Sequence, residues 1–332
     1  MLSISLEKTA DFMSGRGTAF ILIAAILLGS GIGIVLPQAE NIFSNYTDFT
    51  ILALVFLLLF DVRIQDFVAS MNKVGFIIAA LIANFLIIPA LGFAIASLFL
   101  SAHPLFFIGL LIYFMAPCTD WFLGFTRMAD GNTALGAALL PINLVIQLLL
   151  YPVYLHIFGI DAIDAGADNI FQTLWQWFLV PLLMAFSLRF FIERTMGKKH
   201  LELIQTLTSI MVPVFLAILV WQISAANVGT LASHVSIVPL ILSSIFLFFI
   251  LTFFLSDFIS KIMKLSYEDR VLMKMTTAAR NAPLMLAITM AVIPNQPIIY
   301  AAIIIGMLIE LPHLVALKVI LKTQKNAKVI NA

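Results

Sequence analysis

Long apolar stretches alternate with short polar segments along almost the whole chain. A helix that spans a bilayer needs roughly 20 apolar residues. This pattern predicts an all-α polytopic membrane protein with ten transmembrane helices. The predicted spans are residues 17–37, 47–62, 74–100, 104–127, 133–158, 170–192, 203–224, 235–258, 268–293 and 296–320.

Composition supports the same class of protein. The chain is 62% hydrophobic and 11% charged, whereas soluble domains are about 45–50% apolar and about 25% charged. A net charge of +1 indicates no nucleic-acid surface, and a single cysteine excludes an internal disulfide. The five histidines are scattered without metal-ligand spacing. We therefore expect a lipid bilayer as the main partner, and neither a metal nor a cofactor.

The distribution of basic residues tests the number of spans. Positively charged residues concentrate in the cytoplasmic loops of membrane proteins. Seventeen of the eighteen Lys and Arg residues lie on one predicted side of the membrane, in alternate loops with the adjoining span ends or at the two ends of the chain: the N-terminus, 63–73, the end of span four, 189–202, 259–274 and the C-terminus. The intervening loops have none, and 159–169 instead contains three Asp residues. This alternation predicts a multi-pass protein of the cell membrane with both termini in the cytoplasm.

The ten spans divide into two halves of opposite orientation, residues 1–165 and 166–332. Each half has a fourth span that is interrupted, at Pro117 in the first and at residues 280–283 in the second. Matched interruptions in inverted repeats are typical of a transporter's binding site near the membrane midplane. The alternative is that these are ordinary prolines, which neighbouring helices accommodate.

Polar side chains flank both interruptions, and these side chains are the first candidates for binding a substrate. Cys118, Thr119 and Asp120 follow Pro117 in the first half, and Arg280 and Asn281 lie in the second. Helix termini at a break favour anions at the N-terminal end and cations at the carbonyl end. An unpaired charge is costly at this depth. We therefore expect Asp120 and Arg280 to approach each other or share a ligand, the alternative being a purely structural ion pair.

Two further side chains carry possible chemistry. A thiolate at Cys118 is a soft ligand suited to trivalent arsenic or antimony, although a lone cysteine is often only a small buried hydrophobe. Glu310 precedes Pro312, which frees the carbonyl of Leu308. A buried carboxylate there could carry a proton or bind a cation, or could simply hydrogen-bond between helices.

Amide side chains also occur within the spans. Asn84 lies in the third span, and Asn143 and Gln147 are i,i+4 neighbours on one face of the fifth. They could line a cavity or cross-link helices. A glycine pattern in the first span superficially suggests a dinucleotide loop, but close helix packing fits a membrane span better; these are Gly29, Gly31 and Gly33.

With these residues in view, the chain resembles the bile acid:sodium symporter superfamily, in particular its arsenical-resistance (arsenite efflux) branch. The matching motifs are APCTDWF at 116–122, TAARNAP at 277–283 and GMLIELP at 306–312. The resemblance implies that the broken spans four and nine cross. It also implies a panel domain of spans 1, 2, 6 and 7 and a core domain of spans 3–5 and 8–10, moving relative to each other. It also implies that Cys118, Asn281 and Glu310 belong to the substrate site.

The sequence departs from that family pattern around the second interruption. Leu284 stands where the arsenite carriers have a Glu, and Asp120 and Arg280 are not typical of them. Thr276 and Arg280 align with a Glu and a Gln of the sodium-coupled members. A guanidinium at a sodium position favours protons over sodium as the coupling ion.

The sequence therefore predicts a secondary transporter that expels arsenite or antimonite in exchange for protons carried by Asp120 or Glu310. The alternative is an importer or symporter of small organic anions, with Arg280 holding a carboxylate bidentately. An enzyme or a receptor is disfavoured, because no nucleophile–base cluster and no signalling domain is apparent. A homo-oligomer is compatible with the sequence.

Overall fold

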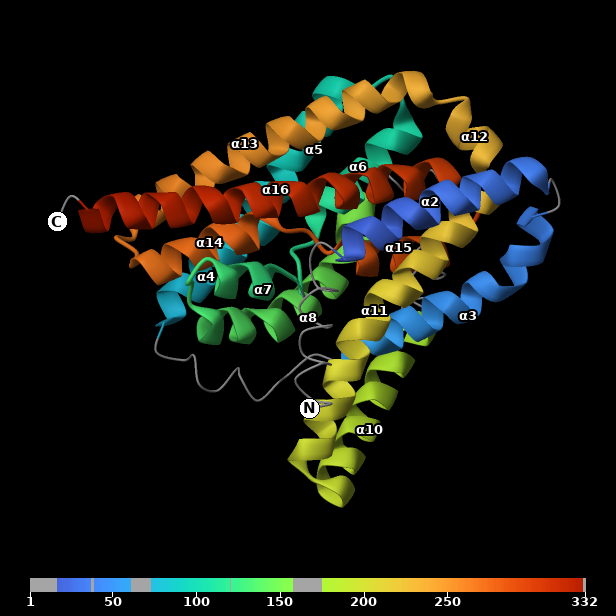
Figure 1. The fold of residues 1–332 in the computed structure, drawn as a ribbon. Coiled ribbons are helices and arrows are strands. Elements are labelled where there is room, and N and C mark those ends of the chain that lie inside the picture. The colour runs from blue at the N-terminus through green and yellow to red at the C-terminus, as the bar shows by residue number, and fades with distance from the viewer. Residues whose placement is uncertain (1–16, 37–38, 61–72, 120, 158–174, 331–332) are drawn as a thin grey trace. The chain divides into compact units, whose positions relative to one another are not determined.

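The computed structural model describes residues 17–36, 39–60, 73–119, 121–157 and 175–330, in which every regular element is helical (Figure 1). The chain separates into two compact units, each assembled from three segments. Unit 1 contains residues 1–62, 159–236 and 283–301, and unit 2 contains residues 63–158, 237–282 and 302–332.

Unit 1 is built mainly on the long helix α11 (Lys198–Ala226), which packs against α2 (Thr18–Val35), α3 (Ala39–Phe60) and α10 (Val180–Met196) (Figure 1). A π-helical turn, η5 (Trp175–Leu179), leads into α10, and the short helix α12 (Val228–Ala232) follows α11. The unit also holds most of α15 (Ala282–Val292) and the first residues of α16 (Pro297–Ile330).

Glycines set the contact between α2 and α11. A Cβ atom at Gly33 would lie 2.2 Å from the carbonyl oxygen of Ala225, and one at Gly29 would lie 2.5 Å from that of Trp221. Gly31 has no atom within 4 Å of its would-be Cβ. Only a residue without a side chain lets two helix backbones approach this closely. The packing interpretation of the glycine pattern is therefore confirmed at two of its three positions.

Unit 2 contains both helix interruptions. Its elements in chain order are α4 (Val74–Ile82), the π-helix η3 (Ala83–Ile87), α5 (Ile88–Leu100), α6 (Pro104–Met115), α7 (Trp121–Met128), α8 (Thr133–Ile157), α13 (Val238–Ile262), α14 (Tyr267–Ala278) and the main part of α16. A 3₁₀ turn, η6 (Val235–Ile237), precedes α13. Helix α5 lies against α6 and α13, and α14 packs against α13, α7 and α8.

Six helices among the described residues are long and apolar enough to cross a membrane, and shorter apolar helices accompany them. These helices are consistent with a polytopic membrane protein. The predicted second span differs from the structure because its helix already begins at Ala39. The inverted repeat of ten spans, the division into 1–165 and 166–332, and the panel and core domains stay predictions.

Both predicted interruptions are present. Helix α6 ends at Met115, and Ala116 is extended (φ −105°, ψ 115°) because a residue before proline avoids the helical region. Helix α14 ends at Ala278, and Ala279 is likewise extended (φ −79°, ψ 138°). The second break therefore begins at Ala279, one residue before the predicted stretch 280–283.

The start of α14 is fixed by polar contacts. The Ser266 hydroxyl accepts a hydrogen bond from the Asp269 backbone N–H at 3.3 Å, an N-cap that satisfies one otherwise unpaired donor. The Asp269 carboxylate also forms an ion pair with Lys73 and accepts a 2.8 Å hydrogen bond from Asn132. These contacts attach the beginning of α14 to the segments before α4 and α8.

Candidate functional site

The two helix breaks lie side by side in unit 2 as a short antiparallel bridge between Pro117 and Arg280. The Cys118 N–H donates to the Ala279 carbonyl at 3.1 Å, and the Asn281 N–H donates to the Ala116 carbonyl at 2.9 Å. We expected backbone groups at the breaks to face a ligand. These two N–H groups instead satisfy the opposite break, so side chains must supply more of any binding site.

Glu310 on α16 joins both breaks. Its Oε1 accepts hydrogen bonds from the Trp121 Nε1–H at 3.2 Å and from the Arg280 backbone N–H at 3.0 Å. Its Oε2 accepts one from the Tyr113 hydroxyl at 3.0 Å. The side chain is fully buried. One carboxylate thus holds the end of α6, the start of α7 and the second break together.

The Arg280 guanidinium is buried in a cage of oxygen atoms. Nη1 donates to the Phe114 carbonyl at 3.1 Å. Nη2 lies within hydrogen-bond distance of the Thr276 carbonyl (3.0 Å), the Thr277 carbonyl (2.8 Å) and the Asn84 side-chain oxygen (3.4 Å). The carbonyls belong to the C-terminal ends of α6 and α14, where helix dipoles are negative. Arg280 neutralises these converging helix ends from within the protein.

Asn84 occupies a π-helical turn of the third predicted span. Its Nδ2 donates to the Thr276 hydroxyl at 3.1 Å, so both ends of the amide bind the second interrupted helix. The turn also directs the Phe85 carbonyl toward the hydroxyl of Tyr154 on α8, which donates to it. Such π-helical turns are frequent at functional sites.

The remaining candidates near the breaks form a smaller contact. The Asn281 Nδ2 donates to the Thr119 hydroxyl at 2.9 Å, while the buried Asn281 Oδ1 has no hydrogen-bond partner among the described residues. Cys118 is fully buried, and as the single cysteine of the chain it forms no internal disulfide. Asp120 lies outside the described residues, so its predicted approach to Arg280 stays a prediction.

The structure therefore brings six of the eight predicted site residues into one contact network, namely Asn84, Cys118, Thr119, Arg280, Asn281 and Glu310. Asn143 on α8 is buried but makes no side-chain hydrogen bond to them.

Sequence reasoning did not single out Tyr113 and Trp121, the side-chain donors to Glu310. The available signal in the sequence was an aromatic residue with a hydrogen-bonding group on each side of the first helix break. Gly306 lies beside this contact, since a Cβ there would be 2.8 Å from the Tyr113 ring.

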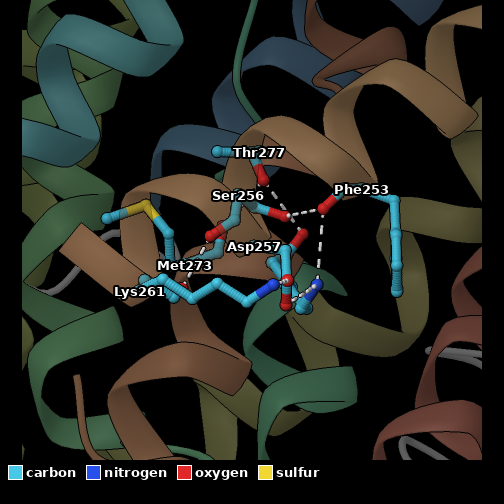
Figure 2. A network of polar contacts seen from close by, with 8 residues as sticks. Phe253, Ser256, Asp257, Lys261, Met273 and Thr277 are labelled. Atoms are coloured by element: carbon cyan, nitrogen blue, oxygen red, sulfur yellow. Dashed lines mark hydrogen bonds and ion pairs between the residues drawn. The ribbon is translucent and has the colours of Figure 1, made fainter. Parts of the chain in front are cut away.

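A second buried charge in unit 2 is Lys274 on α14, which pairs with Asp257 on α13; Figure 2 shows Asp257 with its neighbours Phe253 and Lys261. Lys274 is 1% exposed, and its ammonium group is 3.2 Å from Asp257 Oδ1, 3.3 Å from the Phe253 carbonyl and 3.6 Å from the Phe253 ring centroid. Asp257 also pairs with Lys261 at 2.8 Å. A buried ammonium is tolerated only with such partners. This explains how Lys274, which interrupts the apolar pattern of the ninth predicted span, is accommodated.

Unit 1 has a pocket of about 410 Å³ that none of the predicted site residues lines. Its wall comes from α3, the end of α11 and residues 290–300, with Asp48, Gln222, Asn227 and Tyr300 among its polar groups. The Gln222 Nε2 donates to the Thr50 hydroxyl at 3.2 Å. The pocket and the network around the helix breaks share no residues.

Six apolar helices of spanning length, together with two helix breaks joined through buried polar groups, are typical of a membrane transport protein. A model of the Sodium Bile acid symporter family matches residues 49–229, more than half of the chain. The chain belongs to this family, as the sequence motifs indicated.

Individual relatives agree with that assignment. The chain is 27% identical to the arsenical-resistance protein Acr3 of Corynebacterium glutamicum over 72% of its own length and 67% of that protein. It is 22% identical to Acr3 of Alkaliphilus metalliredigens over 91% and 92% of the two chains. It is also 21% identical, over 58% of each chain, to YocS of Bacillus subtilis, named an uncharacterized sodium-dependent transporter. The family name and the name of the third relative are those of transporters rather than enzymes.

Proposed function

We propose that this protein is a secondary active transporter that expels arsenite or antimonite by alternating access, in exchange for protons. The observation that carries the proposal is the antiparallel contact between the two helix breaks, surrounded by buried polar side chains. Irregular backbone at membrane depth is tolerated where it is enclosed by protein or lines a cavity. The names of the two arsenical-resistance relatives support this substrate class over others.

The substrate contacts would come from side chains. The Cys118 thiol is a soft donor for a trivalent metalloid, and Thr119 and Asn281 would bind its hydroxyl groups. One cysteine cannot supply a three-thiolate site, so hydroxyl contacts carry most of the binding.

The alternative function, transport of small organic anions, requires Arg280 to grip a carboxylate through two parallel N–H groups. Both Nη atoms of Arg280 already donate to protein oxygens, and within the described part of the chain only Nε lacks a partner. A bidentate grip would break these bonds and leave buried carbonyls unsatisfied. The geometry therefore favours a neutral solute over a carboxylate at Arg280.

Coupling would be to protons, through Asp120 or Glu310. Glu310 accepts three hydrogen bonds, and an ionised carboxylate only accepts. Protonating it would add a donor where three donors already point, so protonation would loosen the contact between the breaks. In this scheme both termini face the cytoplasm of a cell-membrane protein, and the panel domain moves against the core domain.

Uptake into everted membrane vesicles tests the proposal. Arsenite, antimonite and a set of carboxylates are offered with and without pH and sodium gradients. We expect arsenite and antimonite uptake that requires the pH gradient and falls strongly in Cys118→Ser.

Two results would overturn the proposal. One is the absence of metalloid uptake under every gradient from vesicles that contain folded protein. The other is sodium-dependent carboxylate uptake, which would establish the alternative. As a control, Ser209→Ala removes a hydroxyl on α11 that donates to the local carbonyl of Thr206, so metalloid uptake should be unchanged.

A further inference from the structure

Two neighbouring amide side chains on α8 are buried without hydrogen-bond partners. Asn143 and Gln147 are 0% and 2% exposed. Both polar atoms of each side chain, four in all, have no partner in the part of the chain that the structure describes. Because the residues are four apart on a helix, the amides lie on the same face.

The absence of hydrogen-bond partners among the described residues argues against a role of these two amides in cross-linking helices. A cross-linking amide resembles Asn84, whose nitrogen and oxygen both bond to the second interrupted helix. An amide buried without a partner is costly, and the cost is relieved when a ligand or a water molecule bonds to it. Four such atoms on one helix face therefore indicate a binding position.

The position belongs to the same unit as the helix breaks. Helix α8 packs against α7, which follows the first break, and against α14, which precedes the second. Asn281 Oδ1, at the second break, is likewise buried without a partner. Unpaired polar atoms thus occur both on α8 and at the break, within one compact unit.

The chemistry of the pair limits what it can bind. Each amide offers two N–H donors and one carbonyl acceptor, and neither carries a charge. A carboxylate would use only the donors, and a bare cation only the acceptors, so each would leave half of the atoms unsatisfied. A neutral solute whose hydroxyl groups both donate and accept can satisfy all four.

We propose that Asn143 and Gln147 form a subsite for the hydroxyl groups of a small neutral solute, and that this subsite selects neutral trihydroxy species over anions. This inference rests on the proposed function in its choice of arsenite and antimonite, which are such species when protonated.

The test compares thermal unfolding and ligand response of the purified full-length protein in detergent. Asn143→Leu and Gln147→Met remove the polar atoms while nearly conserving shape. Asn132→Leu is the matched control, because the Asn132 side chain is fully engaged by Asp269 and by the Leu135 N–H. Probes are arsenite, boric acid as a second neutral trihydroxy compound, and acetate.

We expect Asn143→Leu and Gln147→Met to unfold at the same or a higher temperature than the unchanged protein, whereas Asn132→Leu unfolds at a lower one. The apparent Kd for arsenite and for boric acid should rise roughly tenfold or more in each of the two variants. Acetate should not raise the unfolding temperature of the unchanged protein by binding to Asn143 and Gln147.

Lower unfolding temperatures together with unchanged Kd values would overturn the inference, since the amides would then be structural. Stabilisation by acetate that disappears in the variants would also overturn it. If Asn143→Leu or Gln147→Met fails to fold, Asn143→Ala and Gln147→Ala decide by the same Kd criterion. Boric acid binding that depends on the pair, without arsenite transport in vesicles, would uphold this subsite while refuting the proposed function.

Discussion

Replacing Glu310 by Gln tests whether this carboxylate ties the two helix breaks together. Gln can place its carbonyl oxygen at the Oε1 position, which keeps the bonds from Trp121 and Arg280. Its NH₂ group can donate to the Tyr113 hydroxyl, which turns to accept. All three contacts survive as neutral bonds. A bond to a charged group contributes about 1.5–3 kcal/mol and a neutral one about 0.5–1.5 kcal/mol, so the loss is about 3 kcal/mol.

Glu310→Leu removes every acceptor instead. Three buried donors would then be unsatisfied, each at a cost of about 1–3 kcal/mol, so the loss should be roughly twice that of Glu310→Gln. The positive charge of buried Arg280 also loses a neighbouring carboxylate in both variants. We therefore expect Glu310→Gln to fold with reduced stability and reduced transport, and Glu310→Leu to be largely unfolded.

The assay is thermal unfolding of the purified variants in detergent, followed by arsenite uptake in everted vesicles for those that fold. Tyr113→Phe serves as an intermediate case, since it removes one of the three donors without unsatisfying the carboxylate completely. Equal unfolding temperatures for Glu310→Gln and Glu310→Leu would refute the reasoning. The carboxylate would then contribute charge alone, and its hydrogen bonds would be unimportant for stability.

Two further predictions concern packing and buried charge. Gly33→Ala should destabilise unit 1 by about 1–3 kcal/mol in the same unfolding assay, because the added Cβ overpacks against α11. Gly31→Ala, which places its Cβ in open space, should be neutral or stabilising by up to about 1 kcal/mol. Similar effects at both positions would contradict the packing assignment. Asp257→Asn should lower the free energy of unfolding by about 3–5 kcal/mol, because it leaves the ammonium of Lys274 buried without a counter-charge. Lys274→Met should lower it much less, since Asp257 still pairs with Lys261. In the double variant the two costs should not add, and strict additivity in a double-mutant cycle would argue against the pair.

Local features of the chain were predictable because they depend on residues close in sequence. Pro117 cannot continue a helix, and it forces Ala116 into an extended conformation. The position of that break therefore follows from four or five neighbouring residues. The same holds for the glycines of the first span, where a row of small residues on one helix face indicates close packing whatever helix lies opposite.

The partners of the buried polar groups were not predictable in the same way. The approach of Arg280 to Asp120 stays a prediction, but the described partners of its guanidinium, Phe114, Thr276, Thr277 and Asn84, were not foreseen. Nothing in the local sequence indicates that backbone carbonyls are among the acceptors of this arginine. That choice depends on which helix ends converge around the side chain.

Sequence alone thus determined the class of protein, the apolar helices and the places where two of them break, because hydrophobic length and proline chemistry act locally. The tertiary structure decided how the breaks bond to each other and that Glu310 links Tyr113, Trp121 and Arg280. It also separated a satisfied amide, Asn84, from the unsatisfied pair on α8. These outcomes depend on contacts between residues far apart in the chain, and the same apolar pattern is compatible with many arrangements of those contacts.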